Sequence, residues 1–261
     1  MSTMNPFEKI RTNRKPENVG IHLTKKPKNP IIIEGFPGFG LVGTIATEFL
    51  IEHLKTEEIG KVWFEDMPAI IAIHDGKTIN PIGIFYNEKY NIVIVHSISS
   101  LSGFEWRTAN IIKDIANQLN AKEIICLEGI GTTELPSEEK EVKIEDIKTL
   151  YCGNNETSEN KLNALGAEKL NESILMGIVP ALMLKNQENL TCIFAETYSN
   201  LPDSKAAAKL VQILDKYLGL DVDYKPLVDM AEKFEIKLKS ILEKSQKAVK
   251  EHDEKRPNYF G

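Results

Sequence analysis

The segment from residue 31 to residue 53 constrains the fold most, because it joins three local patterns without a break. The apolar run Ile31–Ile33 predicts a buried strand, and the glycine-rich stretch after it predicts a tight turn. Apolar residues then recur at helical spacing, at Leu41, Val42, Ile45, Ala46, Phe49 and Leu50. A strand, a tight turn and a helix in this order are typical of an α/β domain.

Within the turn, Gly38, Gly40 and Gly43 have the spacing of the dinucleotide-binding fingerprint. In the phosphate-binding form, the first glycine follows the strand almost at once and amides at the helix start face the pyrophosphate. Here four residues separate the apolar run from Gly38, Pro37 lacks an amide hydrogen, and Phe39 would crowd a ligand. We therefore favour no dinucleotide site and no cofactor, with dinucleotide binding as the alternative. The glycines, Gly35 included, would instead let the turn pack against neighbouring backbone.

Composition limits the class of protein. The chain is 42% hydrophobic and 27% charged, which is typical of a globular protein that buries a core. A net charge of −6 provides no basic face for nucleic acid, and no apolar run approaches the ~20 residues of a membrane span. We expect a cytoplasmic protein. Cys126 and Cys192 lie in apolar strand contexts and are predicted to be buried, Cys152 to be more exposed, and no metal site is expected.

Strand and helix patterns alternate along the chain and predict a three-layer α/β domain with a mixed sheet. Strands are expected at 31–33, 59–64, 69–73, 82–86, 92–95, 123–128, 147–152 and 190–196, with a hairpin turn at Asp75-Gly76. Helices are expected after Gly40, at 106–120 and at 204–218. Ser204 is the expected cap of the last of these helices, Gly219 its stop, and 174–184 reads as strand, turn and helix.

Four segments are expected: an extended N-terminal arm at 1–29, an α/β core domain at 30–222, a long helix at 223–250 and a flexible tail at 251–261. Within the long helix, apolar residues follow alternating steps of four and three, which is the pattern of a coiled-coil seam. A helix of ~26 residues is roughly 39 Å long, more than a small domain usually covers. We therefore expect an oligomer interface at Leu227, Phe234, Leu238 and Ile241. Packing of this helix on its own domain is the alternative.

Polar residues at predicted strand ends are the candidates for chemistry, since ligands of open α/β sheets bind at the carboxyl ends of the strands. These residues are His96, Ser100, Ser102, Glu128 and Glu196. Serine and glycine also punctuate ordinary loops. The other histidines have no triad-like context, which leaves His96 as the one candidate histidine, and a histidine at a strand end is more often a satisfied structural residue. We favour the loop interpretation and predict no catalytic residue.

Three blocks together resemble the proteasome assembly chaperone 2 family in its archaeal branch. They are Gly35-Phe36-Pro37-Gly38-Phe39-Gly40 with Val42-Gly43, then residues 177–183 (GIVPALM), then the Glu-Thr, Pro-Asp and Ala-Ala pairs of residues 196–207. The resemblance spans about residues 30 to 220. It implies a fold similar to that of purine nucleoside phosphorylases, to which the apolar spacing described above adds the long C-terminal helix.

The same resemblance implies a non-enzymatic chaperone that binds α-subunits of the 20S proteasome. It also implies a homo-oligomer of four to six subunits, with a paralogous chaperone as a further candidate partner. The alternative is a nucleoside- or nucleotide-binding enzyme related to the purine nucleoside phosphorylases.

Several chaperones of this family end in a hydrophobic residue, a tyrosine and any residue, a tail that docks between α-subunits. This chain ends Tyr259-Phe260-Gly261. Phe260 stands where the tyrosine is usual, so one hydroxyl hydrogen bond, typically ~0.5–1.5 kcal/mol, is missing. Pro257 blocks continuation of the helix, so the three residues would lie on a tether. A frayed tail with incidental aromatic residues is the alternative.

Overall fold

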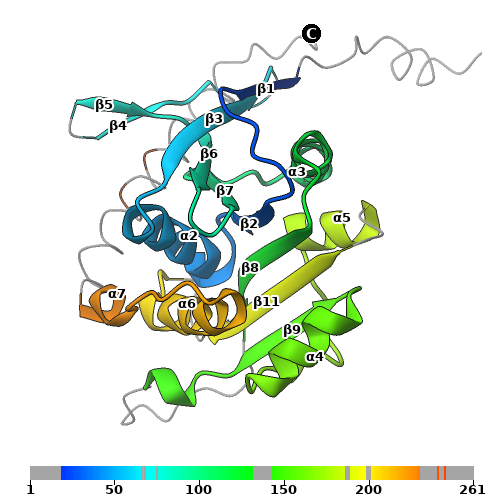
Figure 1. The fold of residues 1–261 in the computed structure, drawn as a ribbon. Helices are drawn as coiled ribbons and strands as arrows, with labels where there is room; N and C mark the ends of the chain where they lie inside the picture. The colour runs from blue at the N-terminus through cyan, green and yellow to red at the C-terminus, as the bar shows by residue number, and fades with distance from the viewer. Residues whose placement is uncertain are drawn as a thin grey trace, which may run out of the picture.

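The computed structural model describes residues 19–65, 67, 69–74, 76–131, 143–185, 189–197, 201–229, 240 and 244. In this part of the chain, nine strands form one mixed sheet in the order β1-β3-β6-β7-β2-β8-β11-β9-β10 (Figure 1). Helices cover both faces of the sheet, which confirms the predicted α/β class with a large mixed sheet.

Four parallel strands form the centre of the sheet: β7 (Ile92–Ser97), β2 (Ile31–Gly35), β8 (Glu123–Gly131) and β11 (Leu190–Thr197). Nearly all residues of β7 and β11 are buried. This pattern explains their almost unbroken apolar sequences, since helices on both faces leave few positions for polar side chains.

Antiparallel pairs extend the sheet. β6 (Ile82–Asn87) pairs with β7, β3 (Glu57–Phe64) with β6, and β1 (Val19–Leu23) with β3. At the other side β9 (Thr149–Gly153) runs antiparallel to β11, and β10 (Glu168–Lys169) runs parallel to β9. The expected N-terminal arm thus contains one strand of the sheet, while residues 1–18 lie outside the described residues.

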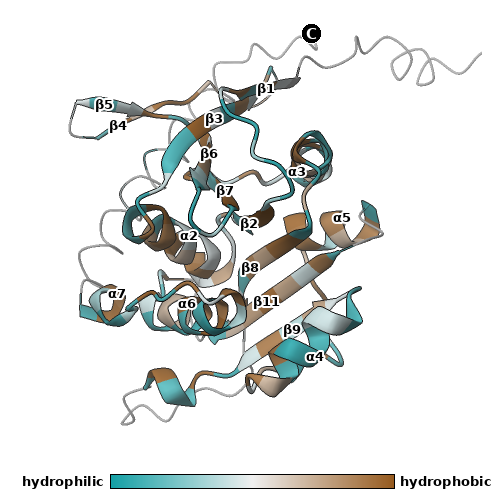
Figure 2. Cartoon of the chain, in the orientation of Figure 1, coloured by the Kyte–Doolittle hydropathy of each residue, from teal (hydrophilic) through white to brown (hydrophobic). Residues whose placement is uncertain are grey.

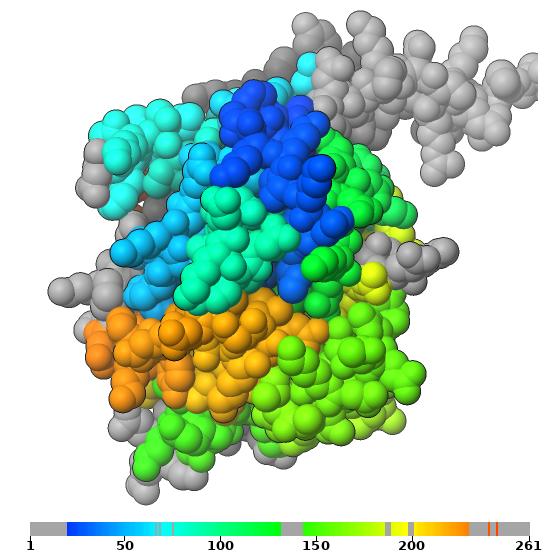
Figure 3. All heavy atoms as spheres, viewed as in Figure 1, coloured from blue at the N-terminus to red at the C-terminus, as the bar shows by residue number. Residues whose placement is uncertain are grey.

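One face of the sheet carries α2 (Val42–His53), α6 (Ser204–Leu218) and α4 (Glu156–Ala164). The buried residues of α2 and α6 are mainly apolar, whereas α4 is largely hydrophilic (Figure 2). Helix α6 packs against α7 (Lys225–Asp229), and the two lie side by side across the middle of the surface seen in Figure 3. Ile33 of β2 packs into this layer.

The opposite face carries α3 (Glu105–Leu119) and α5 (Ile178–Lys185), which pack against each other. Ile32 and Phe36 point into this layer. Because side chains alternate along a strand, Glu34 between them lies on the same face. A carboxyl group is thereby placed inside an apolar layer.

None of the described helices is long and apolar enough to cross a membrane.

Helix α6 spans the predicted range, but its cap differs from the prediction. Asp203, and not Ser204, is the N-cap, and its side chain accepts a hydrogen bond of 2.9 Å from the amide of Ala206. Asp203 has extended backbone, as a cap requires, whereas Ser204 is already helical. Gly219 ends the helix in the left-handed conformation at φ 69°, as expected.

Two predicted strands differ from the structure. Residues 174–176 are irregular rather than a strand, and α5 begins at Ile178. The strand expected at 69–73 is the shorter β4 (Ala72–His74), which pairs with β5 (Lys77–Ile79) in a separate hairpin. This hairpin projects from the body of the molecule (Figure 1). Helix α4 and the single-turn helices η1 (Phe39–Leu41) and η2 (Ile144–Asp146) were not predicted.

The expected C-terminal helix is described only in part. The Asp223 carboxylate lies just before α7 and accepts a hydrogen bond of 3.0 Å from the amide of Lys225, the first residue of that helix. Leu227 is only 1% exposed and packs into the core beside α6. Its side chain therefore has no free surface for a second subunit, which corrects its placement at an oligomer interface. Ser240 and Lys244 are helical. Phe234, Leu238 and Ile241 lie outside the described residues.

Candidate functional site

The glycine-rich turn packs against backbone at three places where a Cβ atom would collide. A Cβ at Gly43 would lie 2.0 Å from the carbonyl oxygen of Leu127, and one at Gly35 would lie 2.4 Å from that of Gly43. On the neighbouring strand, a Cβ at Gly129 would lie 2.2 Å from the carbonyl oxygen of Phe39. These glycines let β2, the turn and β8 approach closely.

The turn also uses the left-handed conformation, at Gly40 (φ 62°) and at Leu41 (φ 52°). The side chain of Leu41 makes this conformation unfavourable for it, whereas Gly40 has no Cβ atom and adopts it without strain. The Gly40 carbonyl accepts a hydrogen bond of 2.9 Å from the amide of Asp203, the cap of α6. The turn is thus tied to the start of a second helix.

The first turn of α2 has no open surface. Val42 and Thr44 are 0% exposed and Gly43 is buried between them. A pyrophosphate would need these helix-start amides to face solvent or a cavity. The fingerprint spacing of the glycines therefore serves close packing of backbone in this fold.

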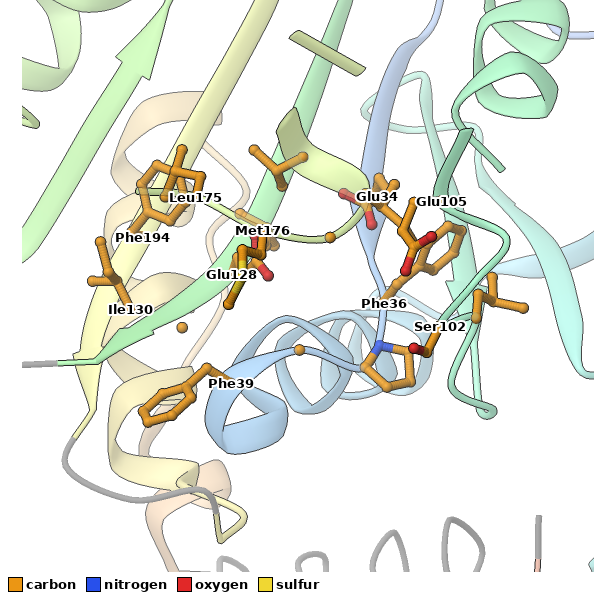
Figure 4. A pocket seen from close by; sticks show the side chains of 18 of the residues that line it. Glu34, Phe36, Phe39, Ser102, Glu105, Glu128, Ile130, Leu175, Met176 and Phe194 are labelled. Carbon is orange, nitrogen blue, oxygen red and sulfur yellow. The ribbon is translucent and has the colours of Figure 1, made fainter. Parts of the chain in front are cut away.

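A pocket of about 610 Å³ lies on the α3 and α5 face, toward the carboxyl ends of β2 and β8 (Figure 4). Its volume is in the range of small-molecule sites. The turn contributes Pro37, Gly38 and Phe39, and the loop before α3 contributes Ser100 and Ser102. The segment before α5 closes another side with Ile174, Leu175, Met176 and Gly177.

Glu34 is the most deeply buried acid of this pocket, with 2% of its surface exposed. Burial raises the pKa of its carboxyl group to about 7, although hydrogen bonds from the Cys126 thiol and the Phe36 amide oppose that rise. Its Oε2 atom is buried and has no hydrogen-bond partner. Buried carboxyl oxygens usually have a partner, so this atom is an acceptor in need of a donor.

Glu128 is the second acid and projects from β8 into the space between the ends of β2 and β8 (Figure 4). Burial, and secondly the nearby charge of Glu34, raises the pKa of Glu128 to about 8. Gly38 leaves room for this carboxyl group, since a Cβ there would lie 2.7 Å from Glu128 Oε1. The conformation of Gly38 is extended, at φ −130°, so it needs room rather than a positive φ.

The remaining walls are mainly apolar. Figure 4 shows Phe36 and Phe39 from the turn, and Ile130, Leu175 and Phe194 on the other sides. Ile174 and Met176 are 91% and 81% exposed, so apolar side chains also stand at the pocket's outer edge. Among the described residues that line the pocket there is no lysine, arginine or histidine.

The other candidate residues are separated by the fold. Ser100 and Ser102 line the pocket with Glu128, but Glu196 does not. His96 is 3% exposed; its Nδ1 lies 2.9 Å from Thr47 Oγ1 on α2, outside the pocket. Its Nε2 lies 3.0 Å from a Glu48 oxygen but is not aligned as a hydrogen bond. The histidine and the serines therefore do not form one site.

The three cysteines form a row across β8, β11 and β9, because Cys126 pairs with Cys192 and Cys192 with Cys152. Cys126 and Cys192 are 0% exposed, as predicted, and Cys152 is partly exposed. The Cys192 contact lowers the pKa of Cys126, but burial and the neighbouring Glu34 raise it overall, to about 12. Thiols that stay protonated are poor nucleophiles. In the described part of the chain, no group of three acidic, histidine or cysteine side chains is placed to hold a metal ion.

Sequence reasoning missed Glu34 and the segment before α5. Glu34 could have been found, because it interrupts a buried strand at a position that alternation assigns to the covered face. Residues 174–184 were predicted as strand, turn and helix, whereas 174–177 form an irregular segment that lines the pocket.

The model of the PAC2 family matches residues 32–242. The chain belongs to the PAC2 family. A PAC2 relative from Methanocaldococcus jannaschii, an uncharacterized protein, is 28% identical over 89% of this chain and 94% of its own length.

Solved structures agree with this assignment. This PAC2 chain is similar to Pyrococcus furiosus PbaA, an archaeal homolog of proteasome-assembly chaperone, with 29% identity and a TM-score of 0.75 over 89% of this chain and 100% of PbaA. Pyrococcus furiosus PbaB, an archaeal proteasome activator, has the same fold, with a TM-score of 0.67 and 22% identity over 85% of this chain and 98% of PbaB. The resemblance to the archaeal chaperone branch is confirmed.

The docking tail predicted from the sequence, Tyr259-Phe260-Gly261, lies outside the described residues of this PAC2 protein. Both the tail and the part of the seam beyond Leu227 therefore remain predictions from sequence.

Proposed function

We propose that this PAC2 protein is a non-enzymatic, cytoplasmic chaperone of proteasome assembly that binds the α-ring of the 20S proteasome. The observation that carries the proposal is the similarity to PbaA, which extends over 89% of this chain at 29% identity. Because the similarity covers the whole length of PbaA, the two proteins share the same layers of sheet and helices. A binding surface common to both would therefore lie on corresponding elements. A second, paralogous chaperone is a further candidate partner.

The proposed contact is the C-terminal tripeptide. In this proposal Tyr259 would supply an apolar ring at the first position, Phe260 a second ring, and Gly261 a terminal carboxylate. Two aromatic side chains bury a large apolar area in a pocket, and a carboxylate pairs well with a lysine. Pro257 and the charged residues before it would hold the tripeptide clear of the folded domain.

We further propose a homo-oligomer of four to six subunits. Several copies of a weak tail on one scaffold raise the avidity by ~10²–10⁴ when they reach separate pockets of a ring. The apolar seam at Phe234, Leu238 and Ile241 is one candidate interface. The projecting β4–β5 hairpin supports a second, because Ile71 and Ile73 are 57% and 72% exposed. Exposed apolar side chains on a projecting hairpin are typical of a contact with another chain.

The layered sheet also fits the proposed likeness to purine nucleoside phosphorylases. The pocket favours a second candidate, a nucleoside- or nucleotide-binding enzyme. However, phosphate is held by basic side chains or open amides, and the described lining residues include acids and no base. The chaperone proposal is therefore preferred.

A pull-down tests the proposal. Full-length protein should retain assembled 20S α-rings, and a chain that ends at Asn258 should not. Equal retention by both chains would show that the tail is not the contact with the α-ring. No retention by either chain would contradict the chaperone function. A rise in melting temperature with phosphate or nucleosides would favour the enzyme instead.

A further inference from the structure

We propose that the pocket between β2 and β8 binds a small organic cation, an amine or amidine carried on an apolar body. This ligand site goes beyond the proposed chaperone function and does not depend on it.

The first support is the unpaired oxygen of Glu34. The residue is 2% exposed and lines the pocket, and its Oε2 atom has no hydrogen-bond partner. The loss of hydration of a buried acceptor costs ~1–3 kcal/mol when no donor replaces the water, and more for a charged group. An ammonium or amidinium group that enters the pocket would supply the missing N–H donor.

The second support is the geometry around Glu128. Its Oε1 lies 2.7 Å from where a Cβ at Gly38 would be and 4.0 Å from where a Cβ at Gly177 would be. Both positions lack a side chain, so the carboxyl group is open to the pocket from two directions. Glu34 and Glu128 project from adjacent strands into the same space (Figure 4).

The apolar walls specify the rest of the ligand. Phe36, Phe39, Leu175 and Phe194 surround a volume of about 610 Å³, far more than an ammonium group fills. A ligand would gain about 25 cal/mol for each Å² of apolar surface that it buries there. An aromatic or aliphatic amine therefore fits better than an inorganic cation.

The charges exclude other ligand classes. An anion would meet Glu34, Glu128 and Glu105 without a basic residue among the described lining. A hard metal ion usually needs at least three protein ligands, and no such group exists among the described residues. An organic cation needs only a carboxyl group of the lining, Glu34 or Glu128, and the apolar walls.

Binding should be coupled to protons. The pKa of Glu34 is raised to about 7 and that of Glu128 to about 8, so near pH 7 Glu34 is about half protonated and Glu128 is mostly protonated. The other titratable groups that face this pair are Cys126 and Cys192, which stay protonated, and Glu105 at the start of α3. A bound cation favours the ionised carboxylates, so its affinity should rise with pH between about 6 and 8 and binding should release protons.

Titration calorimetry with three matched compounds tests the proposal: phenethylamine, 2-phenylethanol and 3-phenylpropionate. Phenethylamine should bind at least ten-fold more tightly than the alcohol or the acid, and the measured heat should change between buffers of different ionisation enthalpy. Equal binding of amine and alcohol would overturn the proposal. So would no heat from phenethylamine, tryptamine or benzamidine at about 10 mM.

Variants locate the binding. Glu34→Gln and Glu128→Gln should each weaken phenethylamine binding at least ten-fold at pH 8, and Glu52→Gln, an exposed acid on α2, should leave it unchanged. If Glu34→Gln fails to fold, two other variants test the binding site. They are Glu128→Gln and Gly38→Val, and the second places a side chain in the pocket. Unchanged affinity in a folded pocket variant would overturn the assignment. Removal of residues 259–261 should not affect amine binding, so this test and the α-ring test fail independently.

Discussion

A Cβ atom at Gly38 would lie 2.7 Å from Glu128 Oε1, so the missing side chain of one residue makes room for the carboxyl group of the other. Gly38 belongs to the turn after β2, and Glu128 belongs to β8. The two strands are neighbours in the sheet, and this relationship opens the pocket where they end. The first prediction follows from it.

Gly38→Ala and Gly43→Ala should differ strongly in stability. At Gly38 a methyl group meets the end of a flexible carboxyl side chain, which can move. The free energy of unfolding should therefore fall by about 1 kcal/mol or less. At Gly43 the methyl carbon would lie 2.0 Å from the backbone oxygen of Leu127, which cannot move away as easily. The free energy of unfolding should therefore fall by about 3 kcal/mol or more. Urea denaturation at neutral pH measures both losses. Similar losses for the two variants would show that the turn does not pack as the structure indicates.

The stability of the folded chain should fall as pH rises through neutrality. Glu34 and Glu128 have an ordinary pKa of 4.5 when unfolded and about 7 and 8 when folded. Between about pH 4.5 and 8 the folded state therefore binds more protons than the unfolded state, and each group lowers the free energy of unfolding by at most about 1.4 kcal/mol per pH unit.

Denaturation at pH 5, 6, 7 and 8 measures this slope. Glu34→Gln should flatten it and stabilise the protein at pH 8, because an amide cannot ionise. Glu52→Gln is the matched control and should retain the slope. A wild-type stability that stays level or rises over this range would contradict the burial of both acids.

The oligomer prediction has two candidate interfaces, which can be tested separately. Light scattering of the purified protein should give four to six times the chain mass of 29.4 kDa. Phe234→Asp with Leu238→Asp should reduce the mass if the seam joins subunits, whereas Ile71→Asp with Ile73→Asp should reduce it if the hairpin does. A wild-type mass near that of one chain at micromolar concentration would contradict the oligomer.

Much of the fold could be predicted from sequence, because the central strands are continuous apolar runs. β2, β7, β8 and β11 were each predicted within a few residues of their observed bounds. The close packing expected of the glycine-rich turn is confirmed at Gly35 and Gly43, where a Cβ atom would collide with backbone. Helix α4 was missed since its sequence is polar, and only Leu162 and Ser158 on it are buried. Its N-cap, Asn155, is a residue type that favours a helix start, but it lies within a charged, turn-rich stretch in which asparagine also favours turns.

The pocket could be predicted only in part. Glu128, Ser100 and Ser102 were candidates by their position at strand ends, which is a local property. Glu34 and the 174–177 segment required knowledge of which strands are neighbours and which loop covers them. Leu227 shows the same limit: a regular apolar spacing does not say whether a side chain packs on its own domain or on another subunit.

The affinity of the intact protein for the proteasome α-ring, compared with that of a chain lacking Tyr259, Phe260 and Gly261, tests the central claim most directly. Surface plasmon resonance on immobilised α-rings should show binding only for the intact chain. A short C-terminal tag should weaken binding as much as the deletion does, because it moves the free carboxylate. Phe260→Tyr should strengthen binding several-fold, at ~1 kcal/mol for the restored hydrogen bond. If the truncated and tagged chains bind as tightly as the intact one, the tail does not dock and the account is contradicted.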